Sequence, residues 1–135
     1  MVGQLLIGLV FAACGDSPPS PSESLNGNWS GTWQFRTAGV MVTENATAML
    51  TQTGSTVSGT WMAQSGPAGE LTFAVAESFT GTLTISQTLL TGQVCSGSTT
   101  VTGSASSSRL EFAAAPIAPA GLCQWATEMQ FSLQR

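Results

Sequence analysis

The sequence contains no histidine, lysine or tyrosine, and only 7% of its 135 residues are charged. General acid–base catalysis usually depends on a histidine or on two converging carboxylates. Glu70, Glu111 and Glu128 fall on the outward phase of their segments, and a serine without a neighbouring base is not a nucleophile. We therefore expect a protein that is not an enzyme, with no catalytic residues and no cofactor.

Positive charge is also scarce, because Lys and Arg together number 3 and the formal net charge is −4. Binding to a nucleic-acid backbone depends on clustered basic side chains that displace counterions. A basic patch is likewise what attracts a protein to an anionic membrane surface. The composition therefore argues against a nucleic-acid partner and against electrostatic membrane binding.

Serine and threonine make up about a quarter of the chain, whereas charged helix formers are nearly absent. Threonine suits strands because its branched side chain fits a pleated surface. An amphipathic helix needs a charged or polar face, for which this chain has little material. The composition therefore predicts an all-β fold.

The first residues read MVGQLLIGLVFAAC, and the apolar run from Leu5 to Ala13 is too short to span a bilayer, which takes about 20 residues. It has the length of a signal-peptide core. Ala12 and Ala13 directly precede Cys14, and this arrangement resembles a bacterial lipoprotein signal. The resemblance implies a signal peptide over 1–13 and a lipidated Cys14, with an ordinary cleaved signal as the alternative.

The stretch from Gly15 to Ser24 has three prolines and four serines and is expected to be an extended tether, so that 14–24 links the lipid to a domain over 25–135. Gly15, rather than aspartate, follows the cysteine. The resemblance therefore implies a bacterial cell-envelope protein anchored to the membrane, in the outer membrane where the host has two.

The number of cysteines is odd, and assigning Cys14 to lipidation leaves Cys95 and Cys123 as a pair. An exported protein meets an oxidising compartment, where a disulfide between them persists. Two thiols without histidine are at best half of a zinc site. We therefore predict a Cys95–Cys123 disulfide and no metal site.

Apolar and polar residues alternate in many short windows, as expected for half-buried strands. These windows, with turn signals such as QTGS at 52–55, SGPAG at 65–69, CSGS at 95–98 and SASSS at 104–108, predict eight or nine strands. One strand is expected around Leu90 and Val94, and the longest runs from Cys123 to Leu133. Mostly hairpin-length links favour an antiparallel up-and-down barrel, with a β-sandwich as the alternative.

A short pattern recurs in which glycine lies between apolar residues and follows serine or threonine. It reads WSGTW at 29–33, VSGTW at 57–61, FTGTL at 79–83, LTGQV at 90–94 and VTGSA at 101–105. In each copy the glycine shares the apolar phase. Inward glycines let strands bend as a barrel closes, or they leave room in the lumen. The sequence does not choose between these two roles.

The run LNGNW at 25–29, the SGTW at 58–61 and the ending MQFSLQR together resemble calycins, the avidin and lipocalin type of barrel. The resemblance implies a barrel with Trp29 closing one end, Arg135 at the close of the final strand, and an opening at the other end. Avidins that bind biotin use a tyrosine, and this chain has none. Biotin binding therefore does not follow from the resemblance.

Several aromatic side chains fall on the inward phase and either fill a core or line a hollow lumen. The candidate ligand-binding residues are Trp33, Trp61, Trp125, Phe79 and Glu44. Glu44 shares its phase with Val42 and Ala46, so a continuous strand points it inward, whereas a bend at 43–45 leaves it in solvent. A lumen with this lining suits an apolar or uncharged small molecule.

The uncharged stretch AAAPIAPAGL at 113–122 is a second candidate surface, because such a loop is poorly suited to water. We formulate two hypotheses for the function. In the first, the protein is a lipid-anchored envelope barrel that binds an apolar or uncharged small ligand. In the second, it is a non-catalytic structural or protein-interaction lipoprotein module whose partner is an envelope protein.

Overall fold

The computed structural model describes residues 24–135, and within this range it contains eight β-strands and no helix. The strands are β1 (Gly27–Thr37), β2 (Val40–Thr53), β3 (Thr56–Ala63), β4 (Ala68–Ala74), β5 (Ser78–Thr88), β6 (Val94–Ala105), β7 (Arg109–Ala114) and β8 (Thr127–Gln134). The predicted all-β class is confirmed. The predicted signal peptide over 1–13, the lipidation site Cys14 and the tether up to residue 23 lie outside the described residues.

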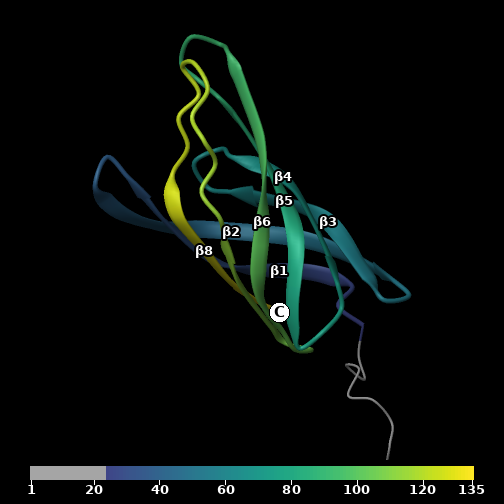
Figure 1. The fold of residues 1–135 in the computed structure, drawn as a ribbon. Helices are drawn as coiled ribbons and strands as arrows, with labels where there is room; N and C mark the ends of the chain where they lie inside the picture. Colours follow the sequence, from purple (N-terminus) through teal and green to yellow (C-terminus); the bar gives the residue numbers. More distant parts are fainter. Residues whose placement is uncertain (1–23) are drawn as a thin grey trace, which may run out of the picture.

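Each strand pairs with the next in an antiparallel manner, and β1 also pairs with β8, so the sheet closes into a barrel. The β1–β8 ladder joins Ser30 to Gln134 and Trp33 to Phe131. This closure confirms the up-and-down barrel and rules out the β-sandwich. The ribbon shows strands that wind around one axis, with hairpins projecting beyond the barrel body (Figure 1).

The turns fall at two ends of the barrel, which we name by their distance from Ser24, the first residue that the structure describes. The proximal end holds Ser24 to Asn26, the turns at 53–56, 74–78 and 105–109, and the C-terminus. The distal end holds the turns at 37–40, 63–68 and 88–94 and the long β7–β8 loop at 114–127. At the distal end the β1–β2 hairpin and the β5–β6 hairpin project from the barrel body, and the β7–β8 loop runs beside the latter (Figure 1).

The strand assignments were wrong around residues 90–98 and at the start of the last strand. Residues 89–93 form the turn between β5 and β6, in which Gly92 has a φ of 92°, and the predicted turn at 95–98 lies inside β6. β8 begins at Thr127 rather than at Cys123. Periodicity failed here because Leu90 and Val94 are apolar and in phase, yet they lie in or beside a turn.

Four of the five repeated glycines lie on the inward phase of their strands, as predicted: Gly31, Gly59, Gly81 and Gly103. A Cβ atom built on Gly31 meets the main-chain oxygen of Ser132, and one built on Gly59 meets that of Met49. The neighbouring strand's backbone therefore occupies the space that a side chain would need. These glycines permit close approach and bending of the strands, which answers the question that the sequence left open.

The proximal end is closed by contacts between the first and last described residues. Leu25 is fully buried, and its carbonyl oxygen accepts a hydrogen bond from Trp29 Nε1 at 3.0 Å. The Arg135 guanidinium lies 4.9 Å from the centre of the Trp29 ring and donates hydrogen bonds to Asn26 O and Ser24 O, both at 2.6 Å. The closed end and the eight-stranded barrel are consistent with a calycin-like fold.

Candidate functional site

Three large aromatic rings meet in the barrel interior. Trp33 on β1, Trp61 on β3 and Phe131 on β8 are each at most 3% exposed. The ring centres lie 5.6 Å apart for Trp33–Trp61, 5.4 Å for Trp33–Phe131 and 5.2 Å for Trp61–Phe131. β3 and β8 are not neighbours in the sheet, so the contact between Trp61 and Phe131 crosses the lumen.

Further rings continue this cluster around the interior. Phe112 on β7 stacks on Phe131 with a centre distance of 4.6 Å, and Phe79 on β5 lies 6.3 Å from Phe112. Phe73 on β4 stacks on Phe79 at 4.1 Å. Rings from six strands therefore form one connected group. These are typical distances for aromatic packing in a protein core, so this level of the lumen is filled by the protein's own side chains.

The structure brings together three of the five candidate ligand-binding residues. Trp33 and Trp61 are in contact, and Trp33 Nε1 donates a hydrogen bond to Glu44 Oε1 at 2.8 Å. Phe79 belongs to the same ring cluster but connects to Trp33 only through Phe112 and Phe131. Trp125 lies in the β7–β8 loop and is half-buried, not inside a strand as expected.

Glu44 lies in the uninterrupted strand β2, half-buried at the distal mouth of the barrel. The bend at 43–45 that would have placed it in solvent is not formed. Its Oε1 atom accepts hydrogen bonds from Trp33 Nε1, from Ser65 Oγ at 2.7 Å and from Ser65 N at 3.2 Å. Burial alone would raise the pKa of Glu44, but the hydrogen bonds from Ser65 and Trp33 outweigh it and hold the pKa below the usual value.

Ser65 was not among the candidate residues of the sequence analysis. It belongs to the turn between β3 and β4, and the sequence marks this turn clearly as SGPAG. Pairing Glu44 with this turn requires knowing that β3 ends opposite Ala46. The turn signal was therefore visible in the sequence, but its carboxylate partner was not.

The predicted disulfide between Cys95 and Cys123 is present, with a Cα–Cα distance of 5.5 Å. It joins the start of β6 to the β7–β8 loop. In the same region, a Cβ built on Gly97 would lie 3.2 Å from the Trp125 ring and 3.3 Å from the side chain of Ile117. Trp125 and Ile117 therefore cover the inward face of β6 near Gly97, in the part of β6 before Val101 that does not pair with β7.

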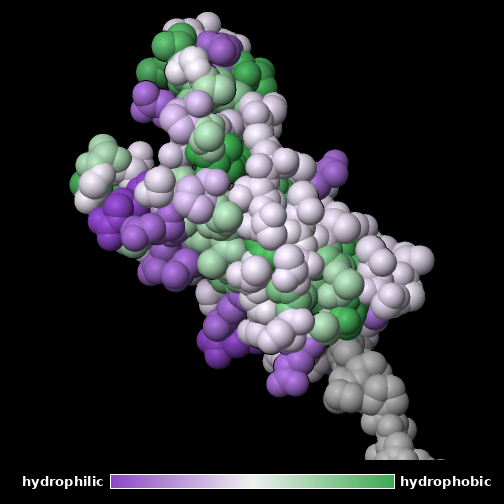
Figure 2. All heavy atoms as spheres, viewed as in Figure 1, coloured by the Kyte–Doolittle hydropathy of each residue, from purple (hydrophilic) through white to green (hydrophobic). Residues whose placement is uncertain are grey.

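Beyond this covered region the molecule carries exposed apolar side chains, and we name this surface the tip. It consists of Leu90, Val94 and Leu122, which are 109%, 59% and 68% exposed. Within the segments that form it, residues 87–95 and 113–126, the sequence has no charged residue. In the space-filling view, hydrophobic atoms are visible on the uppermost lobe, where the β5–β6 turn and the β7–β8 loop project (Figure 2). The sequence analysis missed Leu90 and Val94 because it assigned them to a buried strand face.

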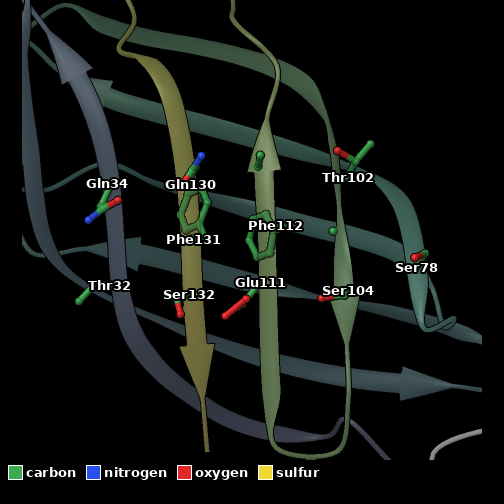
Figure 3. Close-up of a pocket in the computed structure, with 12 residues that line it drawn as sticks. Thr32, Gln34, Ser78, Thr102, Ser104, Glu111, Phe112, Gln130, Phe131 and Ser132 are labelled. Atoms are coloured by element: carbon green, nitrogen blue, oxygen red, sulfur yellow. The ribbon is translucent and has the colours of Figure 1, made fainter.

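A groove of about 570 Å³ crosses the outer face of the barrel over β1, β8, β7 and β6. Its polar lining includes Thr32, Gln34, Ser104, Glu111, Gln130 and Ser132. Figure 3 shows the Glu111 side chain extending toward Ser132 on the neighbouring strand, and the two residues are partners in the ladder. The Glu111 carboxylate also pairs with Arg109 at 3.3 Å. This groove presents hydroxyl and amide groups.

A second groove of about 500 Å³ lies over β1 to β4 and is more apolar. Its lining includes Met49 and Met62, which are 60% and 59% exposed, together with Ala48, Trp61 and Ala68. Both methionines face outward from neighbouring strands. The groove offers flexible apolar side chains that adapt to the shape of a ligand.

Within residues 24–135 no group of three or more histidine, cysteine, aspartate or glutamate side chains is placed to hold a metal ion. None of the described segments forms a helix long and apolar enough to cross a membrane. In comparisons with known proteins, no family model, no curated protein and no solved structure matches the chain.

Proposed function

We propose that this protein is a non-catalytic, lipid-anchored module of a bacterial cell envelope that docks another envelope protein through its tip. The observation that carries the proposal is the concentration of exposed apolar side chains at the distal end. Leu90, Val94 and Leu122, which form the tip, are among the exposed large hydrophobic residues of the described chain, and the exposed Val40 and Met41 lie at the same end but on the separate β1–β2 hairpin. Contiguous exposed apolar surface typically marks an interaction site.

The position of the proposed anchor supports this direction of docking. The described chain begins with Ser24 at the proximal end, where Arg135 holds its carbonyl oxygen. A lipid on Cys14 and the Pro/Ser-rich tether would therefore join the barrel at the end opposite the tip. Extended linkers of this composition act as spacers, so the tip would face away from the membrane, where another envelope protein is accessible.

The filled interior supports docking over binding inside the lumen. A ligand at the level of Trp33, Trp61 and Phe131 would have to displace rings that already contact one another. At the tip, in contrast, the Cys95–Cys123 disulfide joins β6 to the β7–β8 loop, and it therefore restricts the motion of the backbone that carries the apolar side chains. A preordered surface loses less entropy on binding.

The chemistry of the tip defines the kind of partner. Because its segments carry no charge, the complementary surface is an apolar and uncharged one, and salt should weaken the complex little. Apolar anchors at the centre of an interface contribute most of its binding free energy. We therefore expect the complex to depend on Leu90 and Leu122.

A photoreactive amino acid at position 90 in cells tests this proposal. We expect a cross-link to one envelope protein, and we expect the Leu122→Ser variant to lose this cross-link. The purified partner should also bind the purified barrel. The same amino acid at Thr72, an exposed position on β4, should give no such product. Cross-linking to lipid alone, or an equal product from position 72, would contradict docking through the tip.

The other hypothesis, the first of the two drawn from the sequence, is binding of an apolar or uncharged small molecule, and it is supported by the apolar groove beside Met49 and Met62. Its volume of about 500 Å³ lies within the range of small-molecule sites. A native mass spectrum of the disulfide-bonded chain should then show an added mass that disappears on denaturation. Met62→Lys should remove this mass if the groove holds the ligand, and a bare spectrum would count against it.

A further inference from the structure

β2 pairs with β1 along one edge and with β3 along the other, and the β1–β2 hairpin extends beyond the end of β3. β3 ends at Ala63, which is the partner of Ala46, whereas β2 begins at Val40. Residues 40–44 of β2 pair with β1 only. Within residues 24–135, this segment of β2 is therefore a free strand edge at the distal end, and the hairpin that carries it projects from the barrel body (Figure 1).

The main-chain groups on this edge are identified by the alternation of a strand. Asn45 O accepts a hydrogen bond from Gln64 N at 2.9 Å, so the main-chain groups of Asn45 point to the β3 side. In an antiparallel ladder both groups of one residue point to the same side, and the side alternates along the strand. The N–H and C=O groups of Met41 and Thr43 therefore point away from β1, toward the free side.

Natural barrels and sheets usually protect a free edge with charge, proline or a bulge. The stretch Val40-Met41-Val42-Thr43 has none of these, and Val40 and Met41 are 61% and 45% exposed. Val42, the partner of Phe35, is half-buried on the inward side. The edge therefore combines unpaired main-chain groups with β-branched and apolar side chains.

We propose that this edge pairs with the same edge of a second copy of the chain, in an antiparallel register centred on Met41. Two main-chain hydrogen bonds then join the two Met41 residues. On one face Val40 of each copy lies opposite Val42 of the other, and on the other face the two Met41 side chains meet. Cross-strand pairs of this kind stabilise antiparallel sheets.

The second copy is the occupant because the edge is complementary to itself. A second strand satisfies the N–H and C=O groups of Met41 together, and the Val40–Val42 and Met41–Met41 pairs of this register are apolar. Along β2 the nearest carboxylate is that of Glu44, which lies beyond the paired residues and is held by Trp33 and Ser65. The β1 partner of Met41 is Arg36, whose charge is paired with Glu128. The contact is short, so we expect a reversible dimer in solution, which a shared membrane anchor would favour through effective concentration.

Sedimentation of the full chain carrying Cys14→Ser tests the dimer without acyl chains or a third thiol. We expect the weight-average mass to rise with concentration from 13.8 kDa toward twice that value. Met41→Lys places the two introduced lysines opposite each other only in the dimer, whereas Arg36, the β1 partner of position 41 in each copy, is itself paired with Glu128. The variant should therefore raise the dissociation constant of the dimer at least about ten-fold. Thr72→Lys, which adds the same charge to the outer face of β4, should leave the dimer unchanged.

A cross-linking experiment keeps the test informative if Met41→Lys folds poorly. Opposed residues of a hydrogen-bonded antiparallel pair lie about 5.5 Å apart between Cα atoms, which is within the range of a disulfide. Met41→Cys should therefore form a disulfide-linked dimer on mild oxidation, and Thr72→Cys should not. A Cys14→Ser chain with Met41 in place that remains monomeric at all concentrations, or equal cross-linking through position 72, would overturn the proposal. Because the tip residues are untouched, the result is independent of docking through the tip.

Discussion

At the scale of single residues, the interior of the barrel is decided by where a few aromatic rings lie. Trp61 is 3% exposed, contacts Trp33 and Phe131, and donates a hydrogen bond from Nε1 to Thr84 O at 2.9 Å. It therefore contributes to the core from β3 and also ties β3 to β5. This is the arrangement of a structural tryptophan in a packed interior.

Replacing this ring measures how completely the lumen is filled. We expect Trp61→Ala to lower the free energy of unfolding by about 3 to 5 kcal/mol, because the packed neighbours cannot fully close the cavity. Urea unfolding of the oxidised protein measures the change. Met62→Ala, at the exposed neighbour, should cost less than about 0.5 kcal/mol. A loss for Trp61→Ala as small as that for Met62→Ala would indicate a hollow lumen.

Ala38 is a residue in a conformation that its side chain disfavours. The two-residue turn between β1 and β2 has a φ of 51° at Ala38 and 80° at Gly39, which defines a type I′ turn. Asparagine tolerates this left-handed region better than alanine, so Ala38→Asn should stabilise the protein by about 1 kcal/mol. Urea unfolding again measures it. As a control, Ser55→Asn in the turn between β2 and β3, where no positive φ occurs at position 55, should bring no gain.

Glu44 should make stability depend on pH in a defined direction. Its pKa is lowered in the folded protein, where burial is outweighed by the hydrogen bonds from Ser65 and Trp33. The stabilisation is therefore present above the unfolded pKa and is lost as the pH falls through the folded pKa. In Glu44→Gln this part of the acid-side loss should vanish, as measured by thermal unfolding between neutral and acidic pH. An unchanged profile in the variant would show that Glu44 contributes nothing to the pH dependence.

At the scale of elements, the β5–β6 hairpin and the β7–β8 loop depend on one covalent link. β6 continues from Val101 back to Val94 without β7 beside it, and Cys95 is fully buried under the loop that carries Cys123. The loop is also held by Ile117 and Trp125, which pack against the core, and by hydrogen bonds such as the one from Thr99 Oγ1 to Ala115 O at 2.7 Å. The disulfide therefore fixes the shape of the tip.

Removing both cysteines should destabilise the protein and loosen the tip. The bridge spans 28 positions, and the chain-entropy relation gives about 3 to 4 kcal/mol for such a loop. We expect Cys95→Ala with Cys123→Ala to lose this amount in urea unfolding. Hydrogen exchange should then quicken in residues 115–126 while the β1–β3 ladders stay protected. Equal quickening throughout the barrel would mean that the bridge supports the whole fold rather than the tip.

At the scale of the whole molecule, the proposed arrangement has an anchored proximal end and an exposed distal end. Arg135 donates hydrogen bonds to Asn26 O and Ser24 O, so the C-terminus and the first described residue both lie at the proximal end. If Cys14 carries the lipid, cells grown with a tagged fatty acid should label the wild-type protein. Cys14→Ser should abolish the label and release the barrel from the membrane fraction. Persistent labelling of Cys14→Ser would exclude this cysteine as the anchor.

The sequence by itself determined the all-β class, the disulfide pair and the inward phase of four repeated glycines, and it favoured a barrel over the alternative β-sandwich, which only the β1–β8 pairing ruled out. These follow from local alternation, turn residues and the cysteine count, which are properties of neighbouring residues. It failed where an apolar residue in phase does not lie in a strand, as with Leu90 in its exposed turn. A periodic pattern records side-chain polarity and not which strand, if any, lies beside it.

Only the tertiary structure decided whether the rings of β1, β3 and β8 meet across the lumen. It also decided where a hairpin extends beyond the end of the adjacent strand. The first depends on the stagger between strands distant in sequence, which places Trp61 against Phe131. The second depends on differences in strand length, which leave Met41 at a free edge and Cys95 under a loop. The candidate surfaces of this protein arise from those mismatches, because a barrel has free edges only where neighbouring strands end at different heights.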